Sequence, residues 1–140
     1  MAFQLLETFK KKTLITELDL CSVIMEDKEF PWILLIPRVE NVVQINQLSV
    51  EQQLQLAKEI NFCSNLMEGL FDCDRLNVAA IGNKTPQLHI HIICRTETDS
   101  LWPETIWGRE MRRLSYEENK DRANMIIKAF NKAKSECLKI

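Results

Sequence analysis

The two histidines of this 140-residue chain, His89 and His91, lie two residues apart in the segment "PQLHIHIICR" (86–95). The segment has the composition of a buried strand, and a strand turns alternate side chains to opposite faces. One face is uniformly apolar, and we expect it to meet the core: Leu88, Ile90, Ile92 and Cys94. The other face carries nearly everything polar: Gln87, His89, His91, Ile93 and Arg95.

Histidines with this spacing have backbones about 6.6 Å apart, from a rise of about 3.3 Å per residue, so both rings can reach one phosphate-sized group. A neutral imidazole, with a reference pKa of about 6.5, is a competent nucleophile near neutral pH. A protonated imidazole donates to a phosphoryl oxygen or to a leaving group. One strand therefore offers an attacking group and an electrophilic partner at fixed spacing.

The turn "IGNKTP" (81–86) before this strand suits a phosphate. Gly82 lets the backbone approach a ligand closely because it has no Cβ. Asn83 and Thr85 add neutral hydrogen-bonding groups, and backbone N–H groups in such turns bind anions. The turn and the histidines together indicate a phosphate-binding site.

Two other interpretations of the histidine pair stay open. Both rings can be satisfied by structural hydrogen bonds at a sheet edge, because short motifs carry a risk of false matches. A His-x-His strand can also chelate a metal, but zinc needs a third protein ligand even in open catalytic sites. The chain has no third histidine, and Cys94 belongs to the opposite face. We therefore predict no metal.

The elements that must hold this strand form an α+β domain. β-branched and alternating residues predict two short strands within 13–26, turning at Asp19–Leu20, and the proline-bracketed run 31–37 predicts a central strand. Strands at 75–82 and 86–95 complete a mainly antiparallel five-stranded sheet. One long helix packs on this sheet, and a second helix ends the chain.

Both helices have recognisable starts. Ser49 and Gln52 form a capping box for a helix over 49–69 that Gly69 ends. Helical spacing predicts that its core stripe consists of Val50, Leu54, Ala57, Ile60, Ser64 and Met67, widened by Leu56, Cys63, Leu66 and Leu70. Ser115 and Glu118 start a C-terminal helix over about 115–138, whose apolar face extends to Leu138.

Composition limits the partners. A net charge of −2 gives no electrostatic case for binding duplex nucleic acid. No apolar run approaches the roughly 20 residues of a membrane span, and the N-terminus lacks the charge order of a secretory signal. Five scattered cysteines without a C-x-x-C pair indicate free thiols in a reducing compartment. We expect a cytoplasmic protein with one domain over 1–140.

The segment "NVAAIGNKTPQLHIHIICR" resembles the signature of the histidine triad (HIT) superfamily of nucleotide hydrolases and transferases. His89 and His91 match the second and third histidines of that signature, and Gly82-Asn83 falls at its Gly-Gln pair. The proline-bracketed strand, the long helix and "LWPETIWG" extend the resemblance over roughly 13–108. It is closest to small bacterial HIT-like proteins with glutamine first in the motif.

The resemblance implies specific roles. His89 would attack the α-phosphorus of a nucleotide and form a covalent nucleotidyl-imidazole, while His91 would hold phosphoryl oxygens and assist the leaving group. The other implied contacts are Asn83 and Thr85 to the phosphate, Asn77 at its edge, and Asp27 to the ribose. The alternatives are that Asn77 closes a strand end and that Asp27 is a turn residue, and Arg95 is expected to be a surface cation.

The resemblance makes Gln87 the third catalytic residue, beside His89 and His91, but Gln87 departs from the family pattern, which has its first histidine there. Glutamine can donate and accept hydrogen bonds but cannot titrate, so the implied covalent chemistry would have an altered rate or acceptor. The resemblance implies an enzyme acting on a phosphoramidate or dinucleoside polyphosphate, with no cofactor, as a homodimer. The alternatives are a nucleotide-binding protein with little catalysis or a His-x-His metal-binding module.

Overall fold

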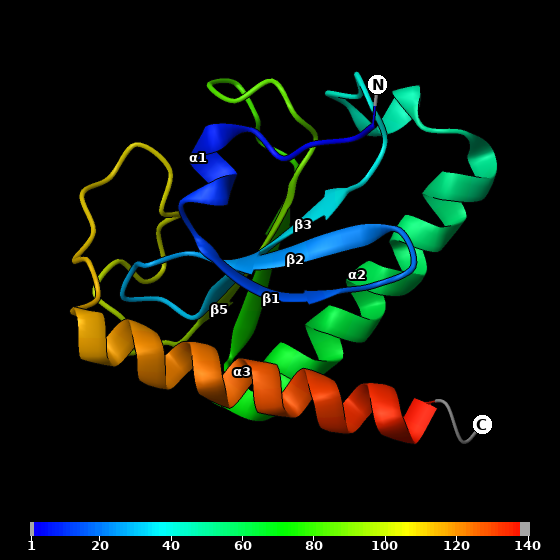
Figure 1. Ribbon diagram of the computed structural model, residues 1–140. Coiled ribbons are helices and arrows are strands. Elements are labelled where there is room, and N and C mark those ends of the chain that lie inside the picture. Colours follow the sequence, from blue (N-terminus) through cyan, green and yellow to red (C-terminus); the bar gives the residue numbers. More distant parts are fainter. Residues whose placement is uncertain (1, 138–140) are drawn as a thin grey trace.

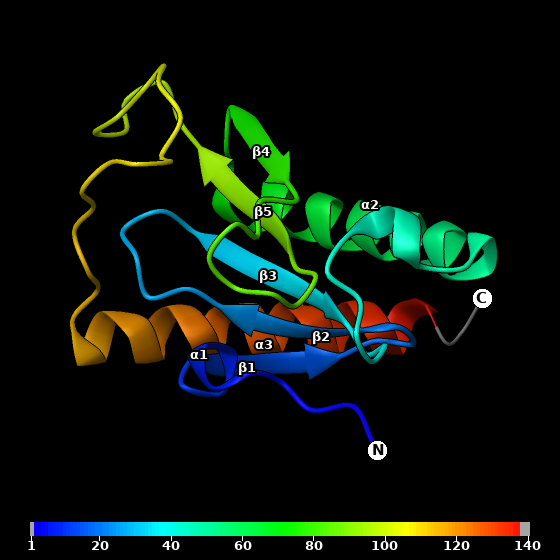
Figure 2. The same cartoon turned by 90° about the horizontal axis from the view of Figure 1, so that it is seen from above.

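The computed structural model describes residues 2–137 and contains one sheet of five strands (Figure 1). The elements in chain order are α1 (Glu7–Lys10), β1 (Thr13–Glu17), β2 (Cys21–Met25), β3 (Trp32–Pro37), the 3-10 turn η1 (Ile45–Gln47), α2 (Val50–Phe71), β4 (Arg75–Ala79), β5 (Ile90–Arg95) and α3 (Tyr116–Cys137). The strand order is β1-β2-β3-β5-β4, and each neighbouring pair is antiparallel (Figure 2). The α+β prediction is therefore confirmed.

The predicted hairpin turn and central strand are both present. β1 and β2 flank Asp19–Leu20, and every residue of β3 is buried. β3 lies third in the sheet and pairs with β2 on one side and β5 on the other. Burial on both faces explains why this strand reads as an unbroken apolar run.

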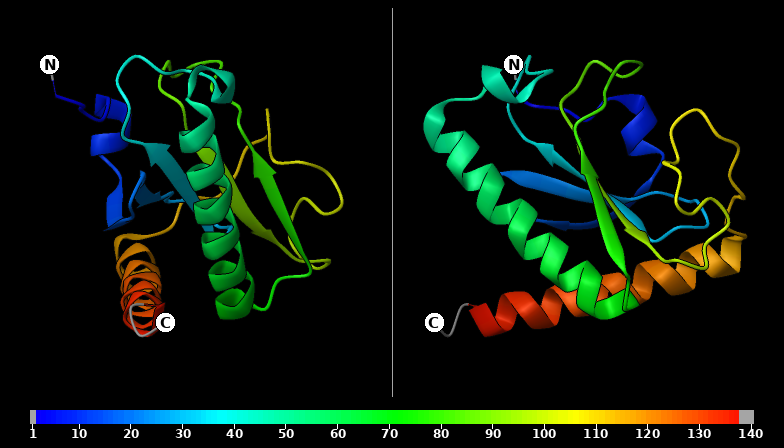
Figure 3. Two further views of the ribbon diagram at one scale, coloured as in Figure 1. Left: turned by 90° about the vertical axis from the view of Figure 1, so that its right-hand side faces the viewer. Right: turned by 180° about the vertical axis from the view of Figure 1, so that it is seen from behind.

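The sheet separates two hydrophobic clusters. The larger cluster lies between the sheet and the helices α2 and α3, and it receives the apolar face of the histidine strand. The view from behind in Figure 3 shows α2 in front of the strands and α1 beyond them. The smaller cluster covers the other face, where Phe9 of α1 and Ile106 of the loop before α3 pack on Trp32 and Ile93. The histidines belong to this second face.

Helix α2 corrects two sequence expectations. The Ser49–Gln52 capping box is present, but the helix runs past Gly69 to Phe71 and ends at Asp72 in a left-handed conformation, with φ 48°. The buried stripe consists of Leu56, Glu59, Cys63 and Met67. Val50 and Leu54, which we expected in the core, are 74% and 63% exposed.

A buried carboxylate explains how the core face of α2 tolerates Glu59. Its two oxygens accept hydrogen bonds from the backbone N–H groups of Leu20 (2.8 Å) and Cys21 (2.9 Å). Glu59 thus satisfies the turn between β1 and β2, where backbone donors would otherwise be buried without partners. A core stripe predicted from apolar residues alone cannot include Glu59, because its role is to accept hydrogen bonds from a buried turn.

Helix α3 begins at the predicted capping box. The Glu118 N–H donates to Ser115 Oγ (3.1 Å), and the Ser115 N–H donates to a Glu118 carboxylate oxygen (3.0 Å). Ala123, Ile126 and Phe130 bury its apolar face against the sheet and α2, whereas Leu138 lies outside the described residues. Within 2–137, neither long helix has the apolar stretch that crossing a bilayer requires.

Candidate functional site

The two imidazoles lie on one face of the sheet, with ring centroids 4.8 Å apart. His91 is part of β5 and pairs with Leu34 of β3 and Ala79 of β4. His89 precedes the strand, which begins at Ile90 rather than at residue 86. Because β5 is an inner strand, His91 has paired strands on both sides and is not at a sheet edge.

The hydrogen bonds of His89 define its tautomer. Its Nδ1 lies 2.7 Å from the carbonyl oxygen of Gln87. A carbonyl can only accept, so Nδ1 carries the proton and Nε2 carries the lone pair in the neutral ring. Among residues 2–137, no hydrogen-bond partner occupies Nε2. This is the protonation pattern of an imidazole that can attack an electrophile.

The absence of a side chain at Gly82 leaves room for the His89 ring. A Cβ at position 82 would lie 3.1 Å from His89 Cε1 and 3.3 Å from the Thr85 carbonyl oxygen. Both distances are too short for an ordinary contact, so the loop can press against the imidazole only because residue 82 is glycine. The close approach expected at Gly82 is therefore made to the histidine itself.

His91 is held differently. The indole N–H of Trp32 donates to His91 Nδ1 (3.1 Å), and His91 Nε2 lies 3.1 Å from the Ile81 carbonyl oxygen, to which it donates. Burial lowers the pKa of His91 to about 4. The ring is thus neutral near pH 7 with both nitrogens in use, and it offers no free donor to a phosphate. This geometry differs from the role in leaving-group assistance that the motif implied.

A cavity of about 670 Å³ opens beside His89. It is bounded by the segment before α2, one residue of α2 and the glycine turn: Val43, Gln44, Ile45, Asn46, Gln53, Ala80, Gly82, Asn83, Pro86, Leu88 and His89. The structure therefore brings together three of the predicted site residues, His89, Gly82 and Asn83. Thr85 is close by, since its carbonyl oxygen faces Gly82 and accepts the Gln87 N–H (2.9 Å).

Two predicted contact residues lie elsewhere. The Asn77 side-chain oxygen accepts a hydrogen bond from Arg95 (3.1 Å). Asp27 pairs with Arg113 (3.2 Å) and lines a separate cavity of about 450 Å³ at the start of α3. Neither residue lines the cavity beside His89, so the geometry gives no support to their implied contacts with a nucleotide.

The expectation that Arg95 is a surface cation is wrong. Its side chain is 2% exposed and binds both carboxylate oxygens of Asp99, at 2.7 and 3.0 Å. Its guanidinium also lies 5.2 Å from the Phe30 ring centroid and 5.8 Å from that of Trp102. Burial is tolerated because the charge is paired bidentately. Arg95 therefore fastens the loop after β5 to the end of the sheet.

Three aromatic side chains enclose the histidines: Trp107, which the sequence suggested could shape the pocket, and Phe9 and Trp32, which sequence reasoning missed. Phe9 meets His89 edge to face, with centroids 4.9 Å apart, and Trp107 meets His91 at 4.7 Å. Trp107 also packs on Trp32. Trp32 could have been found from the sequence. It lies at the start of the strand expected at the centre of the sheet, and alternation fixes the face that its side chain shares with residues of the neighbouring strands. Phe9 gave no signal, since its segment lies about 80 residues from the motif.

Glu26 is a second residue that sequence reasoning missed. It follows β2 and is 9% exposed, and Lys12 pairs with its carboxylate (3.0 Å). Alternation from Ile24 puts it on the histidine face of the sheet. Glu26, the residue before Asp27, is therefore the acidic residue whose position lies on the face of the sheet that carries the histidines.

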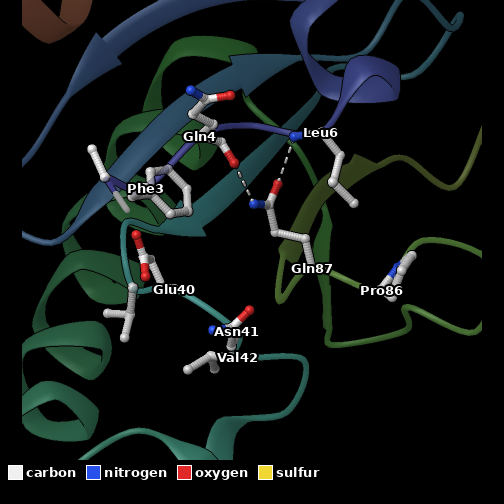
Figure 4. Close-up of a pocket in the computed structure, with 10 residues that line it drawn as sticks. Phe3, Gln4, Leu6, Glu40, Asn41, Val42, Pro86 and Gln87 are labelled. Carbon is white, nitrogen blue, oxygen red and sulfur yellow. Dashed lines mark hydrogen bonds between the residues drawn. The ribbon is translucent and has the colours of Figure 1, made fainter.

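Gln87 directs its side chain away from the cavity beside His89. Figure 4 shows its amide reaching the backbone of residues 4 and 6, above a separate cavity of about 510 Å³ that Glu40 and Asn41 also line. Within residues 2–137, no group of three or more His, Cys, Asp or Glu side chains is arranged to hold a metal ion.

Fold and site together define an α+β protein whose antiparallel sheet presents a histidine pair beside a glycine turn. The HIT domain model matches residues 7–98, about two thirds of the chain, so the chain belongs to the HIT domain family. The match begins before the expected limit at residue 13 and stops before 108. Family membership supports a function in nucleotide binding or hydrolysis.

Solved structures agree in sequence and in shape. A histidine triad protein from Bradyrhizobium japonicum is 35% identical, with a TM-score of 0.85 over 92% of this chain and 98% of that one. Another from Marinobacter aquaeolei is 33% identical, with a TM-score of 0.87 over 95% and 99%. A third from Sinorhizobium meliloti is 28% identical, with a TM-score of 0.84 over 91% and 96%. Among curated proteins, none matches the chain.

Proposed function

We propose that the protein is a nucleotide hydrolase or nucleotidyl transferase that acts at the α-phosphate through a covalent intermediate on His89. The observation that carries this proposal is the state of the His89 ring. Its Nδ1–H is held by the Gln87 carbonyl at 2.7 Å, and the ring lines a cavity of about 670 Å³ with Gly82 and Asn83. A directed lone pair beside a cavity and a glycine turn suits attack on a phosphate.

The reaction has two displacements. The Nε2 lone pair of His89 forms a bond to the α-phosphorus, and the bond from phosphorus to the leaving group breaks. A leaving phosphate departs as an anion, and a leaving amine takes up a proton from solvent. The imidazolium that results keeps its Nδ1–H on the Gln87 carbonyl, which stabilises the positive charge. Water or another acceptor then attacks phosphorus and loses a proton, the phosphorus–nitrogen bond breaks, and neutral His89 returns.

Asn83 and the backbone of the glycine turn are the groups we assign to the phosphoryl oxygens, and Thr85 follows Asn83 by two residues. His91 supports the reaction without exchanging protons, because Trp32 and Ile81 engage both of its nitrogens. Its ring lies between His89 and Trp107 and meets each of them edge to face, so it helps to orient the nucleophile.

The test is intact-protein mass spectrometry after rapid quenching with adenosine 5′-phosphoramidate or a diadenosine polyphosphate. We expect an added mass of one nucleotide on the wild type and none on His89→Ala. His91→Gln is the matched variant, because its side-chain amide can donate to the Ile81 carbonyl as His91 Nε2–H does, without an imidazole, and it should retain the adduct. Turnover by His89→Ala at the wild-type rate would overturn the proposal.

A second candidate is a nucleotide-binding protein with little catalysis. The observation in its favour is that Phe9 and the two tryptophans crowd the rings, leaving both histidines only 6% exposed. Calorimetry with a nucleoside monophosphate distinguishes the two: binding by the wild type, with neither adduct nor product from any substrate tested, would favour this candidate.

A further inference from the structure

The side chain of Gln87 joins two parts of the chain that are more than 80 residues apart. Its Nε2 donates to the Gln4 carbonyl oxygen (2.8 Å), and its Oε1 accepts from the Leu6 N–H (3.1 Å). Figure 4 shows both bonds, with the amide lying alongside residues 4–6 as a neighbouring strand would. The two bonds fix the N-terminal segment to the start of the histidine motif.

The backbone of Gln87 is fixed as well. Its N–H donates to the Thr85 carbonyl oxygen (2.9 Å), and its own carbonyl oxygen accepts from His89 Nδ1 (2.7 Å). With two side-chain bonds and two backbone bonds, the residue has little freedom to rotate. Its carbonyl is therefore aimed at the nucleophilic ring by contacts on every side.

The segment that Gln87 holds also reaches the nucleophile by another route. Residues 4–6 lead directly into α1, whose Phe9 is 3% exposed and meets the His89 ring edge to face at 4.9 Å. Lys12, just beyond α1, pairs with Glu26 on the same face of the sheet. The N-terminal segment is thus anchored at residues 4–6 and at Lys12, with Phe9 against His89 between these anchors.

We propose that Gln87 is a positioning residue, which fastens residues 4–6 so that Phe9 and the Gln87 carbonyl hold His89 as its Nδ1–H tautomer. In the motif predicted from the sequence, Gln87 was a catalytic group. Its amide is instead committed to the N-terminal segment and acts on the reaction only through His89. The kinetic part of this inference rests on the proposed function, whereas the tautomer part does not.

The shape of the side chain explains why glutamine suits this position. A primary amide presents its acceptor and donor side by side, as a peptide edge does, and so matches the Gln4 C=O and the Leu6 N–H, which are two residues apart along one segment. The two nitrogens of an imidazole point in diverging directions. A histidine at position 87 would satisfy at most one of the two backbone groups, so Gln87→His should not restore a more active enzyme.

Two variants disrupt the hydrogen bonds between the Gln87 side chain and the backbone of residues 4–6, one from each side. Gln87→Met keeps the length of the side chain and removes both hydrogen bonds. Leu6→Pro removes the N–H that Gln87 accepts, and it is compatible with the backbone because Leu6 has φ −65°. Leu6→Ala is the matched control, since it loses the same leucine side chain and keeps the N–H.

Long-range ¹H–¹⁵N NMR of the imidazoles gives the tautomers directly, and the chain has only two histidines. In the wild type and in Leu6→Ala we expect His89 to be protonated at Nδ1. In Gln87→Met and Leu6→Pro we expect a mixture of tautomers. With a nucleoside phosphoramidate as substrate, we expect kcat of Gln87→Met and of Leu6→Pro to fall about tenfold with little change in KM. The variant that combines both substitutions should be no less active than either single variant.

A His89 spectrum that stays purely Nδ1–H in folded Gln87→Met and in folded Leu6→Pro would overturn the inference. So would additive effects of the two substitutions, because additivity would show that they do not act through one contact. If the wild type turns over none of the substrates, the proposed function fails, but the tautomer measurement still decides whether Gln87 positions His89.

Discussion

Trp32 and His91 are joined by a buried hydrogen bond in which the indole N–H donates to Nδ1 across 3.1 Å. The bond fixes the neutral Nε2–H tautomer of His91, whose second nitrogen meets the Ile81 carbonyl. The two histidines therefore have opposite tautomers: His89 carries its proton on Nδ1 and His91 on Nε2. In the proposed mechanism, this difference in tautomer leaves His89 Nε2 available for attack, whereas both nitrogens of His91 are hydrogen-bonded.

Trp32→Phe tests this assignment. The substitution keeps most of the aromatic volume and removes the donor to His91 Nδ1, so we expect a mixed tautomer of His91 in the imidazole ¹⁵N spectrum. Loss of one buried hydrogen bond should lower the free energy of unfolding by roughly 1 to 2 kcal/mol. Trp107→Phe is the control, because its ring also packs on His91 but the Trp32 bond remains. An unchanged His91 spectrum in Trp32→Phe would exclude the indole as the cause.

Stability should depend on pH through His91. Burial lowers its pKa to about 4, against about 6.5 in an unfolded chain. Between these values the unfolded state binds a proton that the folded state does not, so the free energy of unfolding rises with pH. Above about pH 6.5, His91 does not lower the free energy of unfolding. As the pH falls from 6.5 toward 4, protonation of the unfolded state lowers that free energy by at most about 3 kcal/mol.

Urea unfolding from pH 4 to 7 measures this dependence. In His91→Gln, position 91 no longer titrates, so the rise between pH 4 and 6.5 should flatten. The Arg112 hydrogen bond to Glu118 lowers the pKa of that carboxyl from 4.5 to about 2, so Glu118 adds its own rise in stability that ends near pH 5. The comparison with His91→Gln is therefore made between about pH 5 and 6.5. A slope in His91→Gln equal to that of the wild type would assign the dependence to other groups.

Gly82→Ala should impair the nucleophile with little effect on the fold. The new methyl group would meet His89 Cε1 at 3.1 Å, so the ring must shift out of line with the Gln87 carbonyl. We expect kcat for a phosphoramidate to fall tenfold or more, since small displacements of a reacting group are costly. Gly69→Ala is the control: nothing lies within 4 Å of a Cβ there, and a helix interior gains up to about 1 kcal/mol. Equal activity of both variants would contradict the assignment.

The buried ion pair of Arg95 and Asp99 should be important for stability. Arg95→Met leaves the Asp99 carboxylate without the guanidinium that binds both of its oxygens. Removing one partner of a buried pair typically costs roughly 3 to 5 kcal/mol, and we expect a loss near the lower limit because Asp99 retains hydrogen bonds from the Thr96 and Leu101 N–H groups. Thermal unfolding of Arg95→Met against the exposed Arg109→Met would measure the difference, and equal losses would show that the pair contributes nothing.

Local patterns were enough to predict the strands and both capping boxes. Period-two alternation and proline boundaries located β1 to β3, and Ser49 and Ser115 marked the helix starts, because these signals depend on neighbours in sequence. They also put the two histidines on one face. The inner position of β5 was not predictable, because strand order depends on contacts between distant segments.

The misjudged residues share one physical cause. Arg95, Glu59 and Gln87 have polar side chains whose partners are distant groups: an arginine buried by a loop carboxylate, a glutamate on two turn N–H groups, and a glutamine on the N-terminal backbone. Residue type suggests exposure or catalysis for each of them. Only the fold shows where the hydrogen-bonding capacity is used.

The N-terminal part of the α2 stripe that was expected in the core is exposed, and it predicts an oligomer instead. Val50 and Leu54 are 74% and 63% exposed, and Ala57 continues the same row at helical spacing. An exposed apolar row on a helix whose other face is already buried marks a contact surface, and the resemblance to HIT proteins implies a homodimer. We expect light scattering to give about twice the 16.4 kDa of one chain. Leu54→Glu should shift the mass toward the monomer, whereas Met125→Glu, an exposed apolar position on α3, should not. A wild-type monomer at micromolar concentration would exclude the dimer.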